Sequence, residues 1–219
     1  MKKFLLFLLL SFTIGHAQNV VIINHVNYTT LYNKSLHYPI MVEWWETKKK
    51  SECPDKLVRS NDFKLDPKLP LETNVNSDYV LGNKLLKSKG LKTFDRGHMC
   101  PARVNLCLGT SIENECFYFS NITPQYHALN AGDWKILETL TYDNSIKNDS
   151  THVWAGSLGV AMKIGKVSVP KQCWKVIYIK KTNQYSAYLF NNDTSKSNGI
   201  EDNKVNIEVI QKLTGLKFK

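Results

Sequence analysis

The segment Asp95-Arg96-Gly97-His98 carries three side chains that together suit hydrolysis of a phosphodiester bond. An imidazole titrates near neutral pH, so His98 is a candidate for the general base that activates a water molecule. Arg96 lies two residues away, and its guanidinium can bind a phosphate through two parallel hydrogen bonds. Asp95 is placed to orient its neighbours. Such cleavage also needs a cation that stabilises charge on the phosphate and on the leaving oxygen.

Each candidate residue, taken alone, also has a purely structural interpretation. A single histidine between glycine and methionine is more often structural than catalytic. Asn130 suits a helix cap, because asparagine is among the best capping residues. Glu138 suits a solvent-facing position on a helix, Asn121 a turn and Arg96 a surface charge. The choice therefore depends on the sequence that surrounds these residues.

Two separate parts of the sequence resemble the DNA/RNA non-specific endonuclease family. The first is DRGHM at residues 95–99, and the second is SNITPQYHALNAGDWKILE at residues 120–138. They occur in the family's order, and Asn121 follows His98 by 121 − 98 = 23 residues. Flanking segments such as YPIMVEWWET and VWAGSLG also look like the family's strands, so the resemblance extends over about Tyr32 to Phe190.

The resemblance implies a role for each matching residue. His98 is implied as the general base, and Asn130 as the only direct protein ligand of an oxygen-preferring ion, Mg²⁺ or Mn²⁺. Glu138 follows Asn130 by 138 − 130 = 8 residues, so both project from broadly one side of a helix. Glu138 would then hold a metal-bound water. Arg96 is implied to stabilise the transition state electrostatically, and Asn121 to support the metal or the substrate.

Substrate binding is expected to involve Asp95 and Arg59 in addition to the arginine of the DRGH motif. Members of the family carry a phosphate-binding arginine upstream of the site, near an Asp-Pro pair. Here Arg59 precedes Asp66-Pro67, but the spacing does not align cleanly. Asn61 is an alternative occupant of the same position, so two assignments stay open.

The surrounding pattern predicts an α+β fold, with an antiparallel sheet core, flanking helices and an embedded ββα-metal finger. The finger is implied by the resemblance, whereas strands on either side of a central helix indicate the α+β class. Strand patterns cover Val20 to Trp45, Phe117 to Ser120, His152 to Met162, Cys173 to Lys181 and Tyr185 to Phe190. Helical patterns cover Ser77 to Leu86, Leu129 to Tyr142 and Glu201 to Leu213.

The first 17 residues, MKKFLLFLLLSFTIGHA, have the order of a secretory signal peptide. Its apolar run is too short to span a bilayer. Removal leaves 219 − 17 = 202 residues, and residues 18–219 are predicted to form a single domain. The remaining formal charge is +10 − 2 = +8. A positive surplus favours nucleic acid or another polyanion as partner, although many exported proteins are also basic.

The sequence also bears on the compartment. Asn121-Ile122-Thr123 is a glycosylation sequon inside the proposed site, where a glycan would block the substrate. We therefore expect a bacterial protein that is secreted or periplasmic, with no membrane anchor. The five cysteines are Cys53, Cys100, Cys107, Cys116 and Cys173. This odd number leaves at least one outside any intrachain disulfide; Cys107 with Cys116 would close a short loop, but the pairing stays open.

Together these observations predict an exported, metal-dependent endonuclease that cuts DNA and RNA alike. Lack of sequence preference is expected because contacts to phosphate carry no base information. Two alternatives remain: a catalytically silent nucleic-acid-binding module, which the charge alone would allow, and a phosphodiesterase with a closed pocket for small nucleotides. A protein inhibitor is a candidate partner if the chain is a delivered toxin, and the oligomeric state stays open.

Overall fold

The computed structural model describes residues 19–51, 59–69, 76–195 and 199–218. The predicted signal peptide at residues 1–17 and Cys53 lie outside these ranges. No helix within them is long and apolar enough to cross a membrane.

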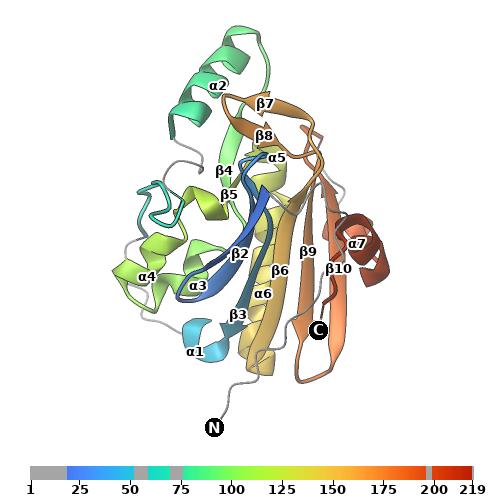
Figure 1. Ribbon diagram of the computed structural model, residues 1–219. Coiled ribbons are helices and arrows are strands. Elements are labelled where there is room, and N and C mark those ends of the chain that lie inside the picture. Colours follow the sequence, from blue (N-terminus) through green and yellow to red (C-terminus); the bar gives the residue numbers. More distant parts are fainter. Residues whose placement is uncertain (1–18, 52–58, 70–75, 196–198, 219) are drawn as a thin grey trace.

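A seven-stranded antiparallel sheet forms the centre of the structure (Figure 1). Its strands, in spatial order, are β1 (Val20–Asn24), β2 (Tyr28–Asn33), β3 (Tyr38–Thr47), β6 (Ser150–Leu158), β9 (Gln172–Ile179), β10 (Gln184–Asn191) and β11 (Lys204–Val205). Every pairing between neighbours is antiparallel. This confirms the predicted α+β fold with an antiparallel sheet core.

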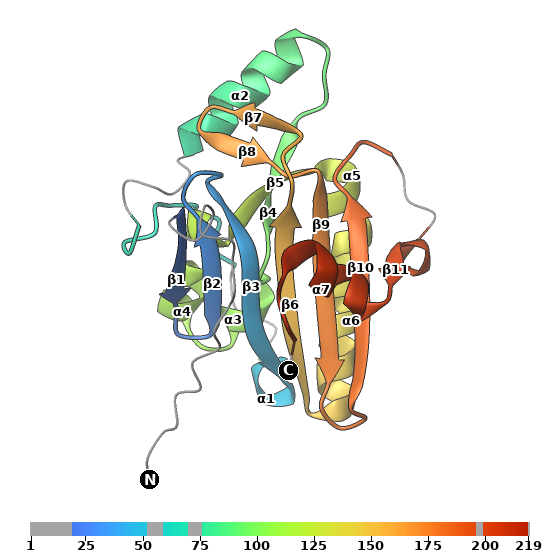
Figure 2. The same cartoon turned by 45° about the vertical axis from the view of Figure 1, so that its right-hand side comes forward.

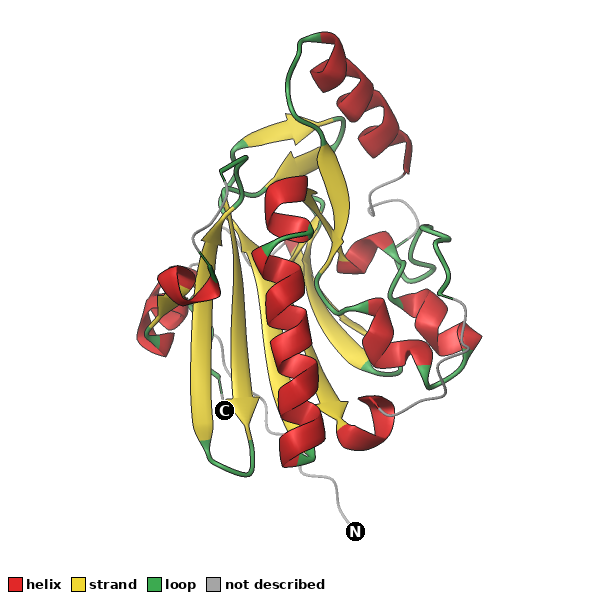
Figure 3. Ribbon diagram, turned by 180° about the vertical axis from the view of Figure 1, so that it is seen from behind, coloured by secondary structure: helices red, strands yellow, loops and turns green. Residues whose placement is uncertain are grey.

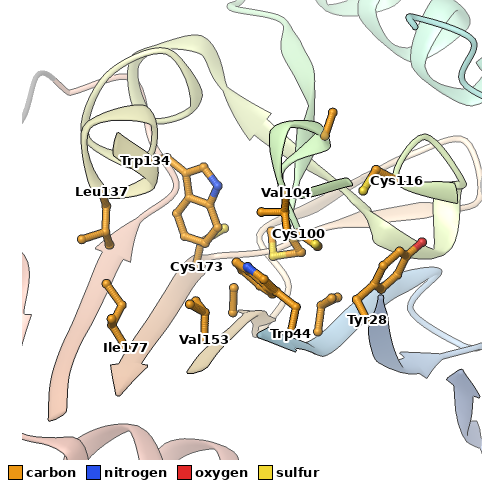
Figure 4. Close-up of a cluster of buried hydrophobic side chains, with 14 of the residues drawn as sticks. Tyr28, Trp44, Cys100, Val104, Cys116, Trp134, Leu137, Val153, Cys173 and Ile177 are labelled. Carbon is orange, nitrogen blue, oxygen red and sulfur yellow. The ribbon is translucent and has the colours of Figure 1, made fainter. Parts of the chain in front are cut away.

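Helices cover both faces of the sheet (Figures 2 and 3). The long helix α6 (Asp133–Asn148) packs across β3, β6 and β9 on one face. Its Trp134 and Leu137 join Val153 of β6 and Ile177 of β9 in one hydrophobic cluster (Figure 4). On the other face, α7 (Ile207–Thr214) contributes Ile210 to a second cluster, which also contains two tryptophans of the sheet. Helix α6, on the first of these faces, carries part of the candidate site.

A second, smaller layer lies beyond one end of the sheet (Figure 1). It contains α2 (Asn76–Ser88) and the hairpin of β7 (Met162–Ile164) and β8 (Val167–Val169). Its buried side chains, which include Tyr79 and Ile164, form a third cluster together with Phe94, which lies outside these elements. The predicted helix at Ser77 to Leu86 is therefore confirmed as α2.

The DRGH motif occupies β4 (Phe94–His98), which pairs with β5 (Ile122–Tyr126) in a two-stranded antiparallel ribbon. Between these strands lie α3 (Ala102–Leu106), α4 (Thr110–Glu115) and the 3₁₀ turn η2 (Phe119–Asn121). The chain continues from β5 into α5 (His127–Asn130) and then α6. Two strands followed by helix are the order expected for the ββα finger.

Three predicted elements differ from the structure. The expected strand at Phe117 to Ser120 is a turn followed by η2, with only an isolated bridge between Lys64 and Tyr118. The run is apolar because it is buried, and its backbone bonds to the loop that contains Lys64: Lys64 donates to the Phe117 carbonyl, and Phe119 donates to the Lys64 carbonyl. A continuous apolar run cannot by itself distinguish a strand from such a buried turn.

The predicted helix from Leu129 to Tyr142 is likewise interrupted, because α5 ends at Asn130 and α6 begins at Asp133. Gly132 caps α6 with φ −95° and ψ −118°. A Cβ at this position would lie 2.2 Å from the carbonyl oxygen of Ala128, so the close approach requires glycine. Asn130 and Glu138 therefore lie on two successive helices.

The remaining helices are short, and the C-terminal one is shorter than expected. Residues 48–51 form α1 (Lys48–Ser51). The predicted closing helix at Glu201 to Leu213 is divided into η3 (Ile200–Asn203), β11 and α7. The structure also decides part of the cysteine pairing. Cys107 is disulfide-bonded, whereas Cys100, Cys116 and Cys173 are free and buried. Pairing of Cys107 with Cys116 is therefore excluded.

Candidate active site

Arg96 and His98 point to the same side of β4, because residues two apart on a strand share a face. Both line a hollow of about 340 Å³ between the β4–β5 ribbon, α3 and α6. The hollow is rich in polar and charged side chains, which include Arg59, Arg96, His98, Arg103, Asn130 and Glu138. The structure thus brings together residues that are up to 138 − 59 = 79 positions apart in the sequence.

His98 lies at the floor of this hollow and is only 8% exposed. Its ring packs against Phe63 and Phe117, with centroids 5.3 and 4.9 Å away. Burial, with smaller contributions from the positive charges of Arg59 and Arg96, lowers the pKa of His98 to about 3. The imidazole is therefore neutral at any ordinary pH. Its Nε2 has no hydrogen-bond partner among the described residues, which suits a group that takes a proton.

Asp95 points to the other side of β4, towards α5. Its Oδ2 accepts a hydrogen bond from Nδ2 of Asn130 at 2.9 Å, and lies 2.8 Å from Nδ1 of His127. A carboxylate can only accept, so the Asn130 nitrogen must face Asp95 and the amide oxygen points elsewhere. Asp95 therefore orients Asn130, in keeping with the expectation that it orients its neighbours. Its part in substrate binding stays a prediction.

Two contacts fix the strand that carries His98. Nε1 of Trp134 donates to the His98 carbonyl oxygen at 3.0 Å and so ties α6 to β4. Gly97 pairs with Thr123 of β5, and a Cβ there would lie 2.1 Å from Oε1 of the buried Gln125. The glycine of the DRGH motif is thus explained by the close packing beneath it.

Two arginines supply positive charge beside His98. The guanidinium of Arg96 lies 4.1 Å from the Phe63 ring centroid, and its Nη1 donates to Oδ1 of Asn76 at 2.7 Å. Arg59 is exposed, and its guanidinium lies 5.5 Å from the Phe117 ring centroid. The structure therefore places Arg59 at the hollow, although the spacing in the sequence left its position open.

Asn121 is not among the residues that line the hollow. Its side chain is fully buried, and its amide bonds to the backbone three times. Oδ1 accepts from the Cys100 N–H at 2.9 Å, while Nδ2 donates to the carbonyls of Cys100 at 2.8 Å and Cys116 at 2.9 Å. These bonds hold the segment that follows His98, so Asn121 acts on the site through the backbone.

Glu138 lines the hollow from α6, beside two positive residues that were not expected there. The Arg103 guanidinium packs 3.9 Å from the Tyr142 ring centroid and donates to the Glu138 carbonyl at 3.3 Å. Lys135 lines the hollow from the preceding turn of α6. Arg103 belongs to the same run as His98, DRGHMCPARVN, so its basic side chain five positions later was an available signal.

The oxygen donors at the hollow fit a hard divalent cation. They are the Asn130 amide oxygen, which Asp95 turns away from itself, and the Glu138 carboxylate. Among the described residues, no group of three or more His, Cys, Asp or Glu side chains could hold a metal ion. A site with a single direct protein ligand, an asparagine, is compatible with that finding.

Comparison with known proteins agrees with this arrangement. A family model described as DNA/RNA non-specific endonuclease matches residues 9–219. The nuclease of Serratia marcescens is 32% identical over 215 residues, which cover 92% of this chain and 76% of that protein. The mitochondrial nuclease EXOG of Danio rerio is 36% identical over 137 residues, but these cover only 54% of this chain and 36% of that protein.

A solved structure shows the same fold. It is titled as the crystal structure of the EndoG/EndoGI complex and the mechanism of EndoG inhibition. The matching chain superposes with a TM-score of 0.77 at 25% sequence identity, over 90% of this chain and 84% of that one.

Proposed function

Because this chain belongs to the DNA/RNA non-specific endonuclease family, we propose that it cleaves phosphodiester bonds with a water activated by His98 and assisted by a divalent cation. The observation that carries the proposal is the neutral, unpartnered imidazole in a hollow with three arginines, Asn130 and Glu138. DNA and RNA are both substrates in this proposal, since no group at the hollow is needed to read a base.

The proposal gives each candidate site residue a task. Nε2 of His98 takes the proton from the attacking water, and Arg96 and Arg59 bind the phosphate oxygens. Asn130 would hold Mg²⁺ or Mn²⁺ through its amide oxygen, with Glu138 supporting the ion's water. The ion, when bound, stabilises negative charge on the phosphate and the leaving oxygen. Asp95 orients Asn130, and Asn121 holds the backbone after His98.

We also propose that the chain is exported after removal of residues 1–17, and that residues 18–219 work as one domain. The order of charged, apolar and small residues at the N-terminus supports this. Mass spectrometry of protein recovered from periplasm and medium tests it, and Gln18 is the expected first residue. A protein inhibitor is a further proposed partner, prompted by the EndoG/EndoGI complex.

The test of function is digestion of plasmid DNA and of structured RNA by the purified chain with and without Mg²⁺. His98→Ala should lower kcat by about 10²- to 10⁴-fold, as expected for loss of a general base. Asn130→Ala should lower activity most at low Mg²⁺. His152→Ala is the matched control, because His152 is a half-buried histidine on β6 that stacks on Trp45 outside the hollow.

Different outcomes identify the alternatives. Undiminished cleavage by His98→Ala would refute the proposed base. Binding of nucleic acid without cleavage by the parent chain would favour the silent module. Turnover of dinucleotides or cyclic nucleotides, but not of polymers, would favour the small-nucleotide phosphodiesterase.

A further inference from the structure

Four aromatic side chains form a row across the sheet, on the face opposite α6. In the register of the strands, Trp45 of β3 lies opposite His152 of β6, which lies opposite Tyr178 of β9. Tyr178 in turn lies opposite Tyr185 of β10. Adjacent residues of a strand point to opposite sides, and Trp44 belongs to the cluster beneath α6. This aromatic row therefore lies on the other face, which α7 partly covers.

The aromatic row lies at one end of the sheet, near the last residues of β3 and β9 and the first residues of β6 and β10. Figure 2 shows that α7 crosses this face nearer the middle of the strands, and that α1 follows β3 at the end where the row lies. The Phe218 ring packs on Trp154 and Trp174, with centroids 5.4 and 5.6 Å away, and so covers aromatic residues further along the sheet. By contrast, Trp45 and Tyr185 at the two ends of the row are 37% and 38% exposed.

The rings of the row are stacked in two pairs. The centroids of Trp45 and His152 lie 4.3 Å apart, and those of Tyr178 and Tyr185 lie 4.6 Å apart. Trp154 also packs on His152, at 3.8 Å, and burial lowers the pKa of His152 to about 4, so this imidazole is neutral at ordinary pH. His152 and Tyr178 thus support the two end rings, which carry the exposed aromatic surface.

Lysines flank the aromatic row at both ends. At the Trp45 end, β3 runs directly into α1 with the sequence KKKS, and Nζ of Lys50 donates to the Trp45 carbonyl oxygen at 3.0 Å. At the Tyr185 end, Lys180 and Lys181 lie in the turn that joins β9 to β10, and both are exposed. Each exposed ring therefore has lysines close to it in the fold.

Few acidic groups oppose these lysines. Glu46 is next to Trp45 in the sequence, but it is 2% exposed and points to the opposite face. Glu43 shares the face of the row and accepts a hydrogen bond from Nε1 of Trp154 at 2.9 Å. Asp149, which precedes β6, is exposed. The lysines of α1 and of the β9–β10 turn outnumber these acids, so this end of the sheet is positively charged.

We propose that the aromatic row and its flanking lysines form a second nucleic-acid-binding surface, which takes a single strand of DNA or RNA. Unpaired bases stack on the exposed rings of Trp45 and Tyr185, and the lysines bind the phosphates. Three strand spacings put the two end rings about 14 Å apart, so a strand of several nucleotides reaches both. Bases in a duplex stack on one another and lack the free faces that these rings need.

The combination of rings and lysines distinguishes this occupant from two others. A neutral glycan can stack on aromatic rings, but it has no use for the lysines. A second copy of the chain in a two-fold contact would bring like charges together, which is unfavourable. A single-stranded nucleic acid has both the flat faces and the negative charge that this surface matches.

The inference goes beyond the proposed function, because binding here requires neither the hollow nor a divalent cation. The hollow is lined by residues of α6, which packs on the opposite face of the sheet. A strand held on the aromatic row is therefore not cut there, but it is kept close to the enzyme. Loss of this surface should raise KM for long single strands and leave kcat at its parental value.

The test measures binding of a labelled oligothymidylate of about 20 nucleotides by fluorescence anisotropy, in the presence of EDTA to prevent cleavage. Trp45→Leu/Tyr185→Leu removes the aromatic faces but keeps apolar side chains, and should raise Kd about tenfold or more. Trp45→Phe/Tyr185→Phe is the matched control, since it keeps a ring at each position, and its Kd should rise less than about threefold.

A second pair of variants tests the charge. Lys180→Gln/Lys181→Gln should weaken binding and reduce the slope of log Kd against log salt by about 1.4, as expected for two lost phosphate contacts on a single strand. Lys84→Gln/Lys87→Gln removes the same charge from exposed positions on α2, and should leave more of the parental slope. Because Lys180 and Lys181 are exposed, this pair tests the surface even if the leucine pair does not fold, which thermal unfolding reports.

Several results would overturn the inference. Equal binding by the leucine and phenylalanine pairs would show that the rings are not needed, and a parental salt slope in Lys180→Gln/Lys181→Gln would exclude the lysines. Tighter binding of a duplex or of a neutral glucan than of the oligothymidylate would assign the surface to another ligand. Dimerisation that only the leucine pair loses, with oligothymidylate binding unchanged, would assign it to a second copy. If the parent binds as expected but cleaves nothing with Mg²⁺, the nuclease proposal fails and this inference stands.

Discussion

Replacing Asp95 with alanine removes the acceptor that fixes the amide of Asn130. In the structure that carboxylate accepts from Asn130 at 2.9 Å, and its side chain is 32% exposed. Without the Asp95 carboxylate, the Asn130 side chain can rotate, and its amide oxygen is no longer held in one orientation. We therefore expect Asp95→Ala to weaken Mg²⁺ binding, while the fold and the position of His98 are retained.

The magnitude follows from the strength of the lost bond. A hydrogen bond to a charged group contributes about 1.5–3 kcal/mol, and partial exposure favours the lower part of this range. Since about 1.4 kcal/mol corresponds to a factor of ten, the Mg²⁺ concentration for half-maximal activity should rise about 10- to 100-fold. Loss of groups that orient metal ligands in other proteins has an effect of similar size.

The assay titrates Mg²⁺ in plasmid cleavage, and repeats the titration by thermal shift without nucleic acid. His127→Ala is the matched control: it removes the other partner of the same carboxylate, but leaves the bond from Asp95 to Asn130. Because His127 is 79% exposed, its loss should change the Mg²⁺ requirement less than about threefold. Parental Mg²⁺ dependence in Asp95→Ala, or equal effects in both variants, would refute the reasoning.

Two further predictions concern stability. Burial raises the pKa of Glu46 to about 7 from its ordinary 4.5, so the folded state binds a proton more tightly than the unfolded state and loses stability as pH rises between these values. Glu46→Gln should match the parent near pH 4.5 in urea unfolding and exceed it by up to about 3 kcal/mol above pH 7; a constant difference across this range would contradict the assignment. Gly132→Ala should lower the free energy of unfolding by about 1–3 kcal/mol, because the added Cβ would meet the Ala128 carbonyl. The same substitution should weaken Mg²⁺ binding, because it displaces α5 from α6. An unchanged melting temperature of Gly132→Ala would show that the turn accommodates the added methyl group, and would contradict this prediction.

The sequence was most informative where chemistry and strand geometry coincide. Arg96 and His98 are two residues apart on an extended strand, so their common face was predictable from spacing. The order of strands and helices also sufficed for the α+β class. Asn121 shows the limit of motif reasoning: the motif places it at the site, but whether an amide faces the hollow or the backbone depends on packing around Cys100 and Cys116.

Other features needed the three-dimensional contacts. The interruption at Gly132 was only weakly signalled by apolar periodicity, because Leu129 and Leu137 are 137 − 129 = 8 residues apart, as in a continuous helix. The signals were the glycine and the spacing of 134 − 129 = 5 residues between Leu129 and Trp134. Lys175 was visible as a charge at an inward position of a predicted strand, but its neighbours come from α6 and β3, which are distant in sequence. Sequence alone therefore marked the residue without indicating what it faces.

The direct pairing of β3 with β6 has a consequence for how the molecule assembles. These adjacent strands are joined by residues 48–149, and the excursion closes at its base where the Lys48 N–H donates to the Asp149 carbonyl at 2.9 Å. Arg59, His98, Asn130 and Glu138 all lie within it. Contacts so remote in sequence form slowly, and the segment that carries the chemistry gains its support only when this long loop has closed. We therefore expect a partly folded chain to lack the site, and catalytic competence to appear among the last events of folding.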